Sequence, residues 1–288
     1  MIRNFISVFV ILLFTLNTSC KKSGGEHSYR PHLSAAHDIV LIEHTVIQVA
    51  ATYIKAIHDS VLMADGYSWI DEAHAYLNPE EDIRNLKIAY DPWGVPDPYK
   101  RYRKGTITAR LPDIDFMVGH EVLLTFDTFL LDEQLIDFER FAVTRLSESA
   151  SADSYRVDIE GGRFISEDKS KDIDFTSVLE LDLHHSNGQH YFKPDDWFSV
   201  NISSAARTAY FFEVESKTEQ DIRFGDSCSY FTEGTSLILF NNLSPDSGYF
   251  SFGESSGKCQ PYFQLDLTDV ILFQSIDWLI TAPETKTK

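Results

Sequence analysis

Residues 34–64 read SAAHDIVLIEHTVIQVAATYIKAIHDSVLMA, and this stretch decides the fold. On a helix its hydrophobic side chains share one face, and these are Ala35, Ile39, Ile42, Val46, Ala50, Tyr53, Ile57 and Val61. The opposite face carries His37, His44, Gln48, Lys55 and Asp59, which indicates a surface exposed to solvent. Ser34 can cap the first turn, and Gly66 can end the helix. We therefore predict one long amphipathic helix whose apolar stripe packs on a sheet.

Three histidines of this helix, His37, His44 and His58, are separated by multiples of seven residues. Residues seven apart on a helix lie about 10.5 Å apart along its axis, which is too far for two of them to share one metal ion. The spacing therefore indicates a polar face and not a metal site.

The hydrophobic pattern changes to a period of two after the helix, which is typical of β-strands. Residues 67–85 fit either a short helix or a strand. The segments that we predict as strands are Leu86–Tyr90, Gly105–Leu111, Glu121–Leu130, Leu135–Leu146, Tyr155–Ile159, Arg163–Ser166, Ile173–Leu183, Gln189–Phe192, Trp197–Ser203, Arg207–Ser216, Ser236–Asn241, Gly248–Phe252, Tyr262–Leu267 and Val270–Thr281. We expect a mainly β protein: an extended or curved antiparallel sheet, or a sandwich as the alternative, with the N-terminal helix packed on it.

The N-terminal segment predicts export. A twelve-residue apolar run from Phe5 to Leu16 follows Arg3, which is the length of a secretory signal and too short to span a bilayer. Thr18 and Ser19 then precede Cys20, an arrangement that resembles the lipobox of bacterial lipoproteins. We interpret residues 1–19 as a signal peptide, Cys20 as the site of lipid attachment, residues 20–33 as a flexible tether and residues 34–288 as the helix and β domain. A division of the β domain into halves, 86–160 and 161–288, is an alternative.

The charge balance narrows the range of partners. The chain carries 44 acidic and 25 basic residues, a formal net charge of −19. So acidic a surface repels nucleic acid and anionic lipid headgroups, and membrane attachment would therefore come from acyl chains. We expect no nucleic-acid partner. The expected location is the outer membrane, on its periplasmic or cell-surface face.

Two cysteines remain once Cys20 is assigned to the lipid. An exported protein tends to pair an even remainder, so Cys228 and Cys259 predict a disulfide that stabilises by roughly 3–4 kcal/mol. Two buried free thiols are the alternative.

Several motifs, taken in order, resemble one protein family. They are Ile88-Ala89-Tyr90-Asp91, Arg101-Tyr102-Arg103-Lys104-Gly105-Thr106-Ile107, Leu124-Thr125-Phe126-Asp127-Thr128-Phe129, and Gly225-Asp226-Ser227-Cys228 paired with Gly248-Tyr249-Phe250-Ser251-Phe252-Gly253 and Cys259. Together they are similar to a family of uncharacterised bacteroidete-type outer-membrane lipoproteins, over residues 86–267. The resemblance implies a β-rich, lipid-anchored protein and brings no activity with it.

The most specific candidate for a metal site is a pair of histidines in a predicted hairpin. Asn187-Gly188 is typical of a two-residue turn, which would place His185 opposite His190, with Cβ atoms about 5 Å apart. Such a pair could bind zinc or copper, with His184 or Asp182 as a third ligand. The alternative is an exposed hairpin tip with incidental histidines. Calcium is a weaker candidate, in the loop of Glu167, Asp168, Asp172 and Asp174, whose solvated carboxylates lack the spacing of a calcium loop.

A basic and aromatic cluster is the main ligand candidate. Its residues are Trp93, Tyr99, Arg101, Tyr102 and Arg103. Aromatic rings beside guanidinium groups suit an anionic or sugar ligand. The alternative is a strand-edge cluster that discourages pairing between edges.

No catalytic residue is identified, and the chain has no His-Glu-x-x-His or phosphate-loop motif. We predict a non-catalytic binding or structural lipoprotein without a cofactor, with a glycan or an envelope protein as its partner. An exported hydrolase acting on glycans or cell-wall material is the alternative, so enzymatic activity is left open.

Overall fold

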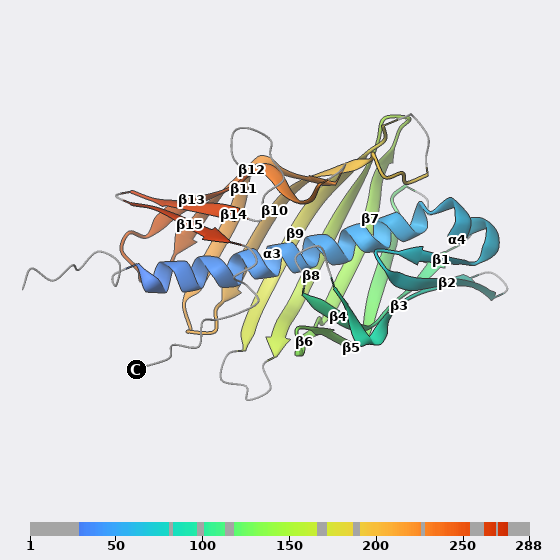
Figure 1. The fold of residues 1–288 in the computed structure, drawn as a ribbon, viewed down its shortest axis with the longest axis horizontal. Coiled ribbons are helices and arrows are strands. Elements are labelled where there is room, and N and C mark those ends of the chain that lie inside the picture. Colours follow the sequence, from blue (N-terminus) through green and yellow to red (C-terminus); the bar gives the residue numbers. More distant parts are fainter. Residues whose placement is uncertain are drawn as a thin grey trace, which may run out of the picture.

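The computed structural model describes residues 29–80, 83–96, 101–112, 118–165, 172–186, 191–225, 228–253, 262–268 and 270–275. The predicted signal peptide, Cys20 and most of the predicted tether lie outside these residues. The described chain forms two helices and one antiparallel sheet, with helix α3 lying along the concave side of that sheet (Figure 1).

The predicted long helix exists, but its bounds differ. Helix α3 (Arg30–Ile57) begins with Pro31 in its first turn and not at Ser34, so residues 30–33 are helical and do not belong to a tether. It ends at Ile57, and a second helix, α4 (Ser60–Asp65), starts after Asp59, whose carboxylate accepts a hydrogen bond from the Leu62 N–H at 2.6 Å. A local cap therefore divides the predicted helix into two. Gly66 ends α4 with a φ of 74°, as predicted.

The strands follow one another along the chain. Their bounds are β1 (Tyr67–Ile70), β2 (Ala73–Glu80), β3 (Ile83–Pro96), β4 (Tyr102–Pro112), β5 (Glu121–Leu131), β6 (Gln134–Asp137), β7 (Arg140–Glu148), β8 (Ala152–Ile165), β9 (Ile173–His184), β10 (Trp197–Arg207), β11 (Glu213–Gly225), β12 (Cys228–Phe240), β13 (Ser247–Phe252), β14 (Tyr262–Leu267) and β15 (Val270–Ser275). Successive strands pair antiparallel, with β6 and β7 sharing the position between β5 and β8. The prediction of a mainly β protein with an antiparallel sheet and one long N-terminal helix is confirmed.

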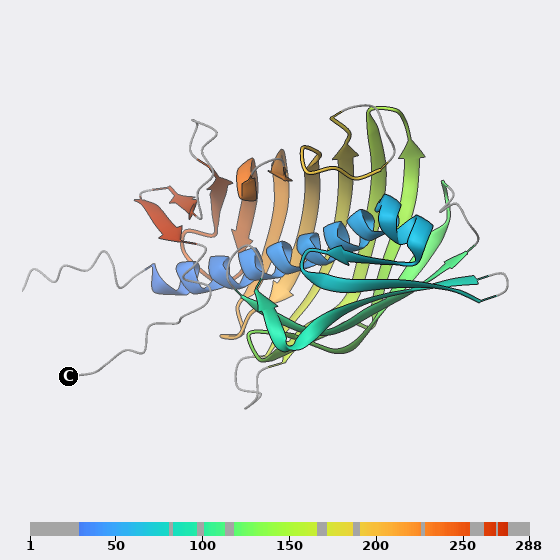
Figure 2. The same ribbon diagram turned by 45° about the vertical axis from the view of Figure 1, so that its right-hand side comes forward.

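The sheet is continuous and curved. Strands β8–β12 lie behind α3, and β1–β4 return on the other side of its C-terminal half (Figures 1 and 2). Several neighbouring strands shift register, as between Lys104 and Thr106 where β4 pairs with β5, and such bulges bend a sheet. The alternative boundary at residues 160 and 161 falls inside β8, at a register shift in its pairing with β9, and the strand continues on both sides of it.

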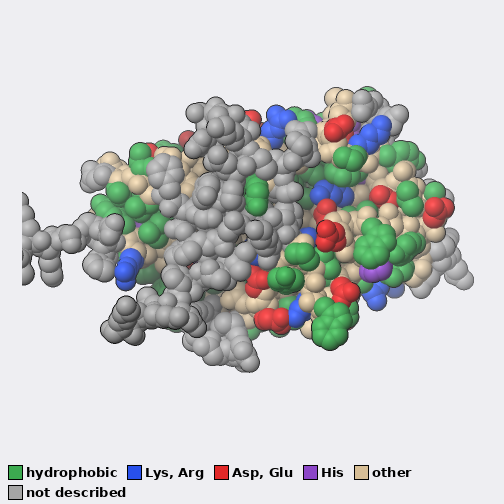
Figure 3. All heavy atoms as spheres, viewed as in Figure 1, with side chains coloured by type: hydrophobic (Ala, Val, Ile, Leu, Met, Phe, Trp, Pro, Cys, Tyr) green, Lys and Arg blue, Asp and Glu red, His purple; other side chains and the backbone are tan. Residues whose placement is uncertain are grey.

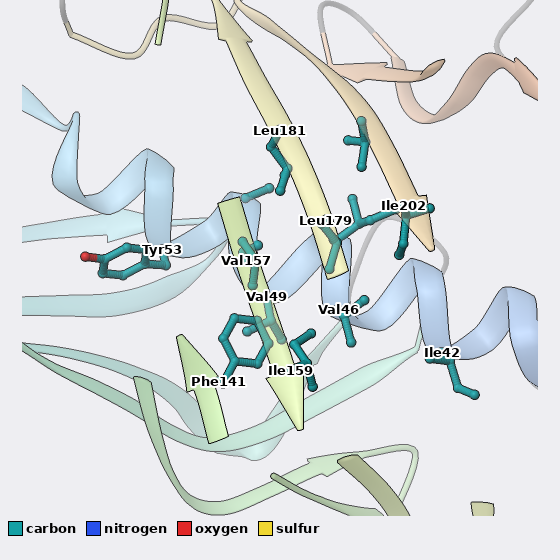
Figure 4. Packing of buried hydrophobic residues seen from close by; sticks show 14 of the residues in the cluster. Ile42, Val46, Val49, Tyr53, Phe141, Val157, Ile159, Leu179, Leu181 and Ile202 are labelled. Atoms are coloured by element: carbon teal, nitrogen blue, oxygen red, sulfur yellow. The ribbon is translucent and has the colours of Figure 1, made fainter. Parts of the chain in front are cut away.

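The apolar stripe of α3 packs on the sheet as predicted. Val46 and Val49 lie among residues of four strands (Figure 4), and Ile42 and Tyr53 are buried in the same core. Those partners are Phe141, Val157, Ile159, Leu179, Leu181 and Ile202, and all of them are buried. Burial of this kind is the main favourable contribution to folding.

The prediction that the polar face of the helix is exposed to solvent is wrong. His44 is 0% exposed and Gln48 6% exposed, while His37, Lys55 and Asp59 are half-buried. A polar face normally indicates solvent, but a sheet that curls around a helix encloses both of its faces. The helix is long and apolar enough to cross a membrane, yet 94% of its most apolar window is buried inside the domain, as in a core helix.

The bulge at Gly105 brings β4 and β5 close together, and this close approach can be tested. Gly105 has a φ of 94°, and a Cβ there would lie 2.2 Å from the carbonyl oxygen of Thr128. We expect Gly105→Ala to lower the free energy of unfolding by at least about 2 kcal/mol more than Gly119→Ala, measured by urea denaturation. Gly119 is the matched control because it has a φ of 87° but no atom within 4 Å of the added Cβ. Equal losses in the two variants would contradict this close approach.

Candidate functional site

The sheet divides the predicted ligand cluster between its two faces. Arg101 is 1% exposed and Arg103 4%, and both belong to the interior. Tyr102 and Trp93 are 51% and 89% exposed, and both belong to the outer surface. Tyr99 lies outside the described residues. The two arginines therefore form neither a surface ligand site with these aromatic rings nor an exposed strand edge.

The buried arginines hold α3 instead. The Arg101 guanidinium contacts Nδ1 of His44, and the Arg103 guanidinium lies 5.0 Å from the centre of the Tyr90 ring. Burial lowers the pKa of His44 well below its usual value, and the charges of Arg101 and Arg103 lower it further. His44 is therefore neutral near pH 7.

A neighbouring ion pair fixes the turn between β1 and β2 to the helix. Asp71 of this turn accepts hydrogen bonds from Lys55 Nζ at 2.8 Å and Thr52 Oγ1 at 2.7 Å. Burial alone would raise the pKa of Asp71, but the charges of Lys55 and Arg103 and these hydrogen bonds lower it below its usual value.

The predicted metal histidine lies in a buried network. His185 has a side chain that is 1% exposed, with Nε2 at 3.0 Å from Asp153 Oδ2 and Nδ1 at 3.5 Å from Asp196 Oδ2. Strand β9 ends at His184, which pairs with Trp197 of β10, and the two-residue turn predicted at Asn187-Gly188 lies outside the described residues. His190 lies outside the described residues, so the proposed pair of histidines stays a prediction.

Asp153 is the centre of this network. It is 0% exposed and lies 3.5 Å from His58 Nε2 and 3.1 Å from Arg145 Nη2. The ring nitrogen of His58 lies 2.5 Å from the Tyr155 hydroxyl. Burial would raise the pKa of Asp153, but the hydrogen bond with His185 and the charge of Arg145 lower it below its usual value. The network fixes the end of α3 to strands β7 and β8.

The other cofactor predictions find no support in this arrangement. Within the part of the chain that the structure describes, no three His, Cys, Asp or Glu side chains are placed to hold a metal ion. In the calcium candidate loop, Glu167 and Asp168 lie outside that part, and Asp174 pairs with Arg163 and Arg207. Cys259 also lies outside it, so the disulfide with Cys228 stays a prediction.

A buried carboxyl group lies at the middle of the helix. Glu43 is 0% exposed and faces Ser204 of β10 and Ser216 of β11, which stand directly opposite each other. Burial raises the pKa of Glu43 from 4.5 to about 8, although the hydroxyls of Ser216 and Ser204 lower it. The group is therefore mostly protonated at pH 7. All of these interior groups are closed to a ligand.

The outer surface carries an aromatic cluster that the sequence did not reveal. We call Tyr67, Trp69, His74, Tyr76 and Trp93 the aromatic surface. Tyr67 stands opposite Tyr76, and Trp69 opposite His74, on β1 and β2. The Trp69 and His74 ring centres are 3.8 Å apart, and those of Tyr67 and Tyr76 5.3 Å apart. Figure 3 shows hydrophobic side chains around a histidine over these strands.

A depression of about 520 Å³ opens between the two tryptophans. Its lining includes Glu72, Asp91 and His74, and none of its described lining residues is a lysine or an arginine. Asp91 accepts a hydrogen bond from the Trp93 N–H at 2.8 Å, and this turn in β3 leaves the Trp93 side chain 89% exposed. The depression thus combines two flat aromatic rings with hydrogen-bond acceptors.

A larger groove of about 920 Å³ lies across the outer face of β8–β12. Its two arginines are already paired, since Asp174 Oδ2 lies 2.5 Å from Arg207 Nη2 and Asp174 Oδ1 lies 3.3 Å from Arg163 Nε. Its described lining contains no exposed aromatic ring. The aromatic surface is therefore the better candidate.

The turn between β1 and β2 explains why the sequence pattern does not predict the aromatic surface. Asp71 and Glu72 connect β1 to β2 with φ angles of 47° and 62°, as in a type I′ turn. Glycine or asparagine normally provides such angles, so the pair gave no hairpin signal. The alternation of Tyr67 with Trp69, and of His74 with Tyr76, is the signal that could have found it.

No protein-family model, curated protein or solved structure matches this chain. The candidate site therefore rests on its own geometry.

The buried Glu43 predicts a pH dependence of stability. The unfolded chain loses this proton near pH 4.5 and the folded protein near pH 8, so stability falls as the pH rises between these values. His44 acts in the opposite sense, but only below about pH 6.5. From pH 6.5 to 8 we expect the wild type to lose about 2 kcal/mol, and Glu43→Gln to abolish this loss.

Urea denaturation at the two pH values measures this difference. Glu160→Gln is the control, because Glu160 is exposed and its replacement should leave the wild-type slope unchanged. A slope that persists in Glu43→Gln would show that another group is responsible.

Proposed function

We propose that this protein is a lipid-anchored, non-catalytic protein of the cell envelope that binds glycans on its aromatic surface. The observation that supports this most is the depression between Trp69 and Trp93, which are 57% and 89% exposed. Large aromatic rings are rarely left in water together unless they contact a partner.

The chemistry of the depression favours a neutral sugar. A sugar ring offers C–H groups to the face of an aromatic ring, and its hydroxyls donate hydrogen bonds to carboxylates such as Glu72 and Asp91. An anionic ligand would be repelled by the same two carboxylates and by the formal net charge of −19. We therefore expect an uncharged glycan.

The position of the aromatic surface agrees with a lipid anchor at Cys20. Helix α3 begins at Arg30, whereas the β1–β2 turn contacts Thr52 and Lys55 in its C-terminal half (Figure 1). Twenty-two residues of helix correspond to about 33 Å. An anchor before Arg30 would leave the aromatic surface well away from the membrane.

An exported hydrolase is the second candidate. The two carboxylates of the depression favour it, since paired carboxylates hydrolyse glycosidic bonds in most glycosidases. The exposed, open arrangement of these groups favours binding without hydrolysis.

The aromatic surface predicts a loss of binding on truncation. We expect Trp69→Ala and Trp93→Ala each to weaken binding to a neutral polysaccharide at least tenfold, which corresponds to about 1.4 kcal/mol. Affinity electrophoresis against a panel of neutral and acidic polysaccharides measures this. Tyr210→Ala, an exposed aromatic residue on another turn, is the control and should bind as the wild type does.

Two results would contradict the proposal. Binding that survives in the Trp69→Ala, Trp93→Ala double variant would place the site elsewhere. Release of soluble sugars by the wild type, lost in Glu72→Gln or Asp91→Asn, would make the protein a hydrolase.

The lipid anchor has its own test. We expect Cys20→Ala to lose fatty-acid labelling and to leave the membrane fraction, because a single thiol carries the acyl chains. Ser23→Ala, a nearby change outside the lipobox-like motif, should keep both. A Cys20→Ala protein that still carries the label and sediments with membranes would rule out this anchor.

A further inference from the structure

We propose that the turn between β10 and β11, residues 208–212, contacts the membrane surface and inserts Tyr210 and Phe211 among the lipid headgroups. This inference rests on the proposed lipid anchor at Cys20, and it is independent of glycan binding. The partner is a zwitterionic phospholipid surface, because the acidic protein disfavours an anionic one.

The turn holds two aromatic rings in solvent. Tyr210 is 58% exposed and Phe211 74% exposed. Phe211 has a φ of 64°, which is unusual for a bulky residue and costs free energy. Hydrogen bonds from Phe211 N to Thr208 O at 2.8 Å, and from Phe212 N to Thr208 Oγ1 at 3.1 Å, maintain this conformation. The turn therefore presents these rings on a defined backbone.

The turn lies beside the part of the helix that follows the proposed anchor. The Ala209 N–H donates to Asp38 Oδ2 of α3 at 3.1 Å, and Asp38 is eight residues after Arg30, or about 12 Å along the helix. Nine residues lie between Cys20 and Arg30, and the ten residue-to-residue steps that join them reach at most about 35 Å. A lipid on Cys20 would thus keep this end of the domain close to the bilayer.

The chemistry of the turn suits the interface between water and lipid. Tyrosine and other amphipathic aromatic residues are enriched at that depth, where their apolar rings leave water and their polar atoms stay in it. The Arg207 guanidinium, which pairs with Asp174, lies 5.9 Å from the Phe211 ring and helps to hold this ring at the turn. Insertion of the turn would add a second contact to the acyl chains and would orient the domain.

Photo-crosslinking in vesicles tests this contact. We would replace Phe211 with the photoreactive analogue benzoyl-phenylalanine in the full-length lipidated protein and reconstitute it in phosphatidylethanolamine–phosphatidylcholine vesicles. The same replacement at Trp93 is the matched control, because Trp93 is 89% exposed but lies near the C-terminal half of α3. Circular dichroism of the Phe211 variant would check its fold.

We expect at least ten times more lipid adduct at position 211 than at position 93, measured by mass spectrometry. Equal or fewer adducts at position 211, in protein that floats with the vesicles, would overturn this inference and leave the anchor standing. Protein that carries no acyl chain and does not float would overturn both the anchor and this inference. The polysaccharide result changes neither outcome.

Discussion

A buried polar group destabilises a protein unless it is hydrogen-bonded or paired, and α3 carries such groups along its length. The curved sheet provides a partner for each of these polar groups, and a different strand or turn provides it at each position along the helix. Asp38 accepts from a backbone N–H of the β10–β11 turn, Glu43 faces serines of β10 and β11, and His44 contacts Arg101. Toward its C-terminal end, Lys55 pairs with Asp71 of the β1–β2 turn, and His58 with Asp153 and Tyr155 on β8. The helix and the sheet therefore specify each other.

These contacts provide what apolar packing alone would not. The hydrophobic effect is nearly non-directional, so an apolar helix packed in an apolar concave sheet could rotate or slide with little loss of stability. A one-turn slide would separate Lys55 from Asp71, and a rotation would move Glu43 from its serines into an apolar environment. The pairs thus fix both the rotation and the axial position of α3. They also fix where the sheet may curl, because the β1–β2 turn reaches the helix through Asp71.

The local patterns of the sequence determined much of this fold, and its tertiary partners were the part that stayed hidden. Period-two alternation revealed most strands, but Arg207–Ser216 was predicted as one strand where a turn at residues 208–212 separates β10 from β11. That turn contains Tyr210, Phe211 and Phe212, which are strand-favouring by composition. His44 and Gln48 were assigned to solvent because amphipathic periodicity identifies a polar face without showing what covers it. The side chains that cover this face come from distant parts of the chain, as Arg101 does where it contacts His44.

The same limit affected the candidate site. Trp93 and Tyr102 were predicted to share a ligand site with Arg101 and Arg103. The arginines point into the core while the two rings are exposed, since neighbours on a strand face opposite sides. The partners of Trp93 on the surface, Trp69 and His74, come from the hairpin that neither period nor turn chemistry had identified. A single sequence shows which residues have the chemistry to bind a ligand, whereas the register of the strands decides which of them lie side by side.

Burial separates two clusters that look equally functional by residue type. The chain of Asp196, His185, Asp153, His58 and Tyr155 alternates carboxylates with imidazoles, as catalytic sites often do. Its central groups are almost fully buried, and their contacts join the end of α3 to β8 and to the segment before β10. The aromatic surface has the opposite character, because its rings contribute little to the core and remain in contact with water. A group that stabilises the fold is enclosed with its partners, whereas Trp69 and Trp93 are each more than half exposed to solvent. The function of this protein is therefore best sought on the outside of the sheet.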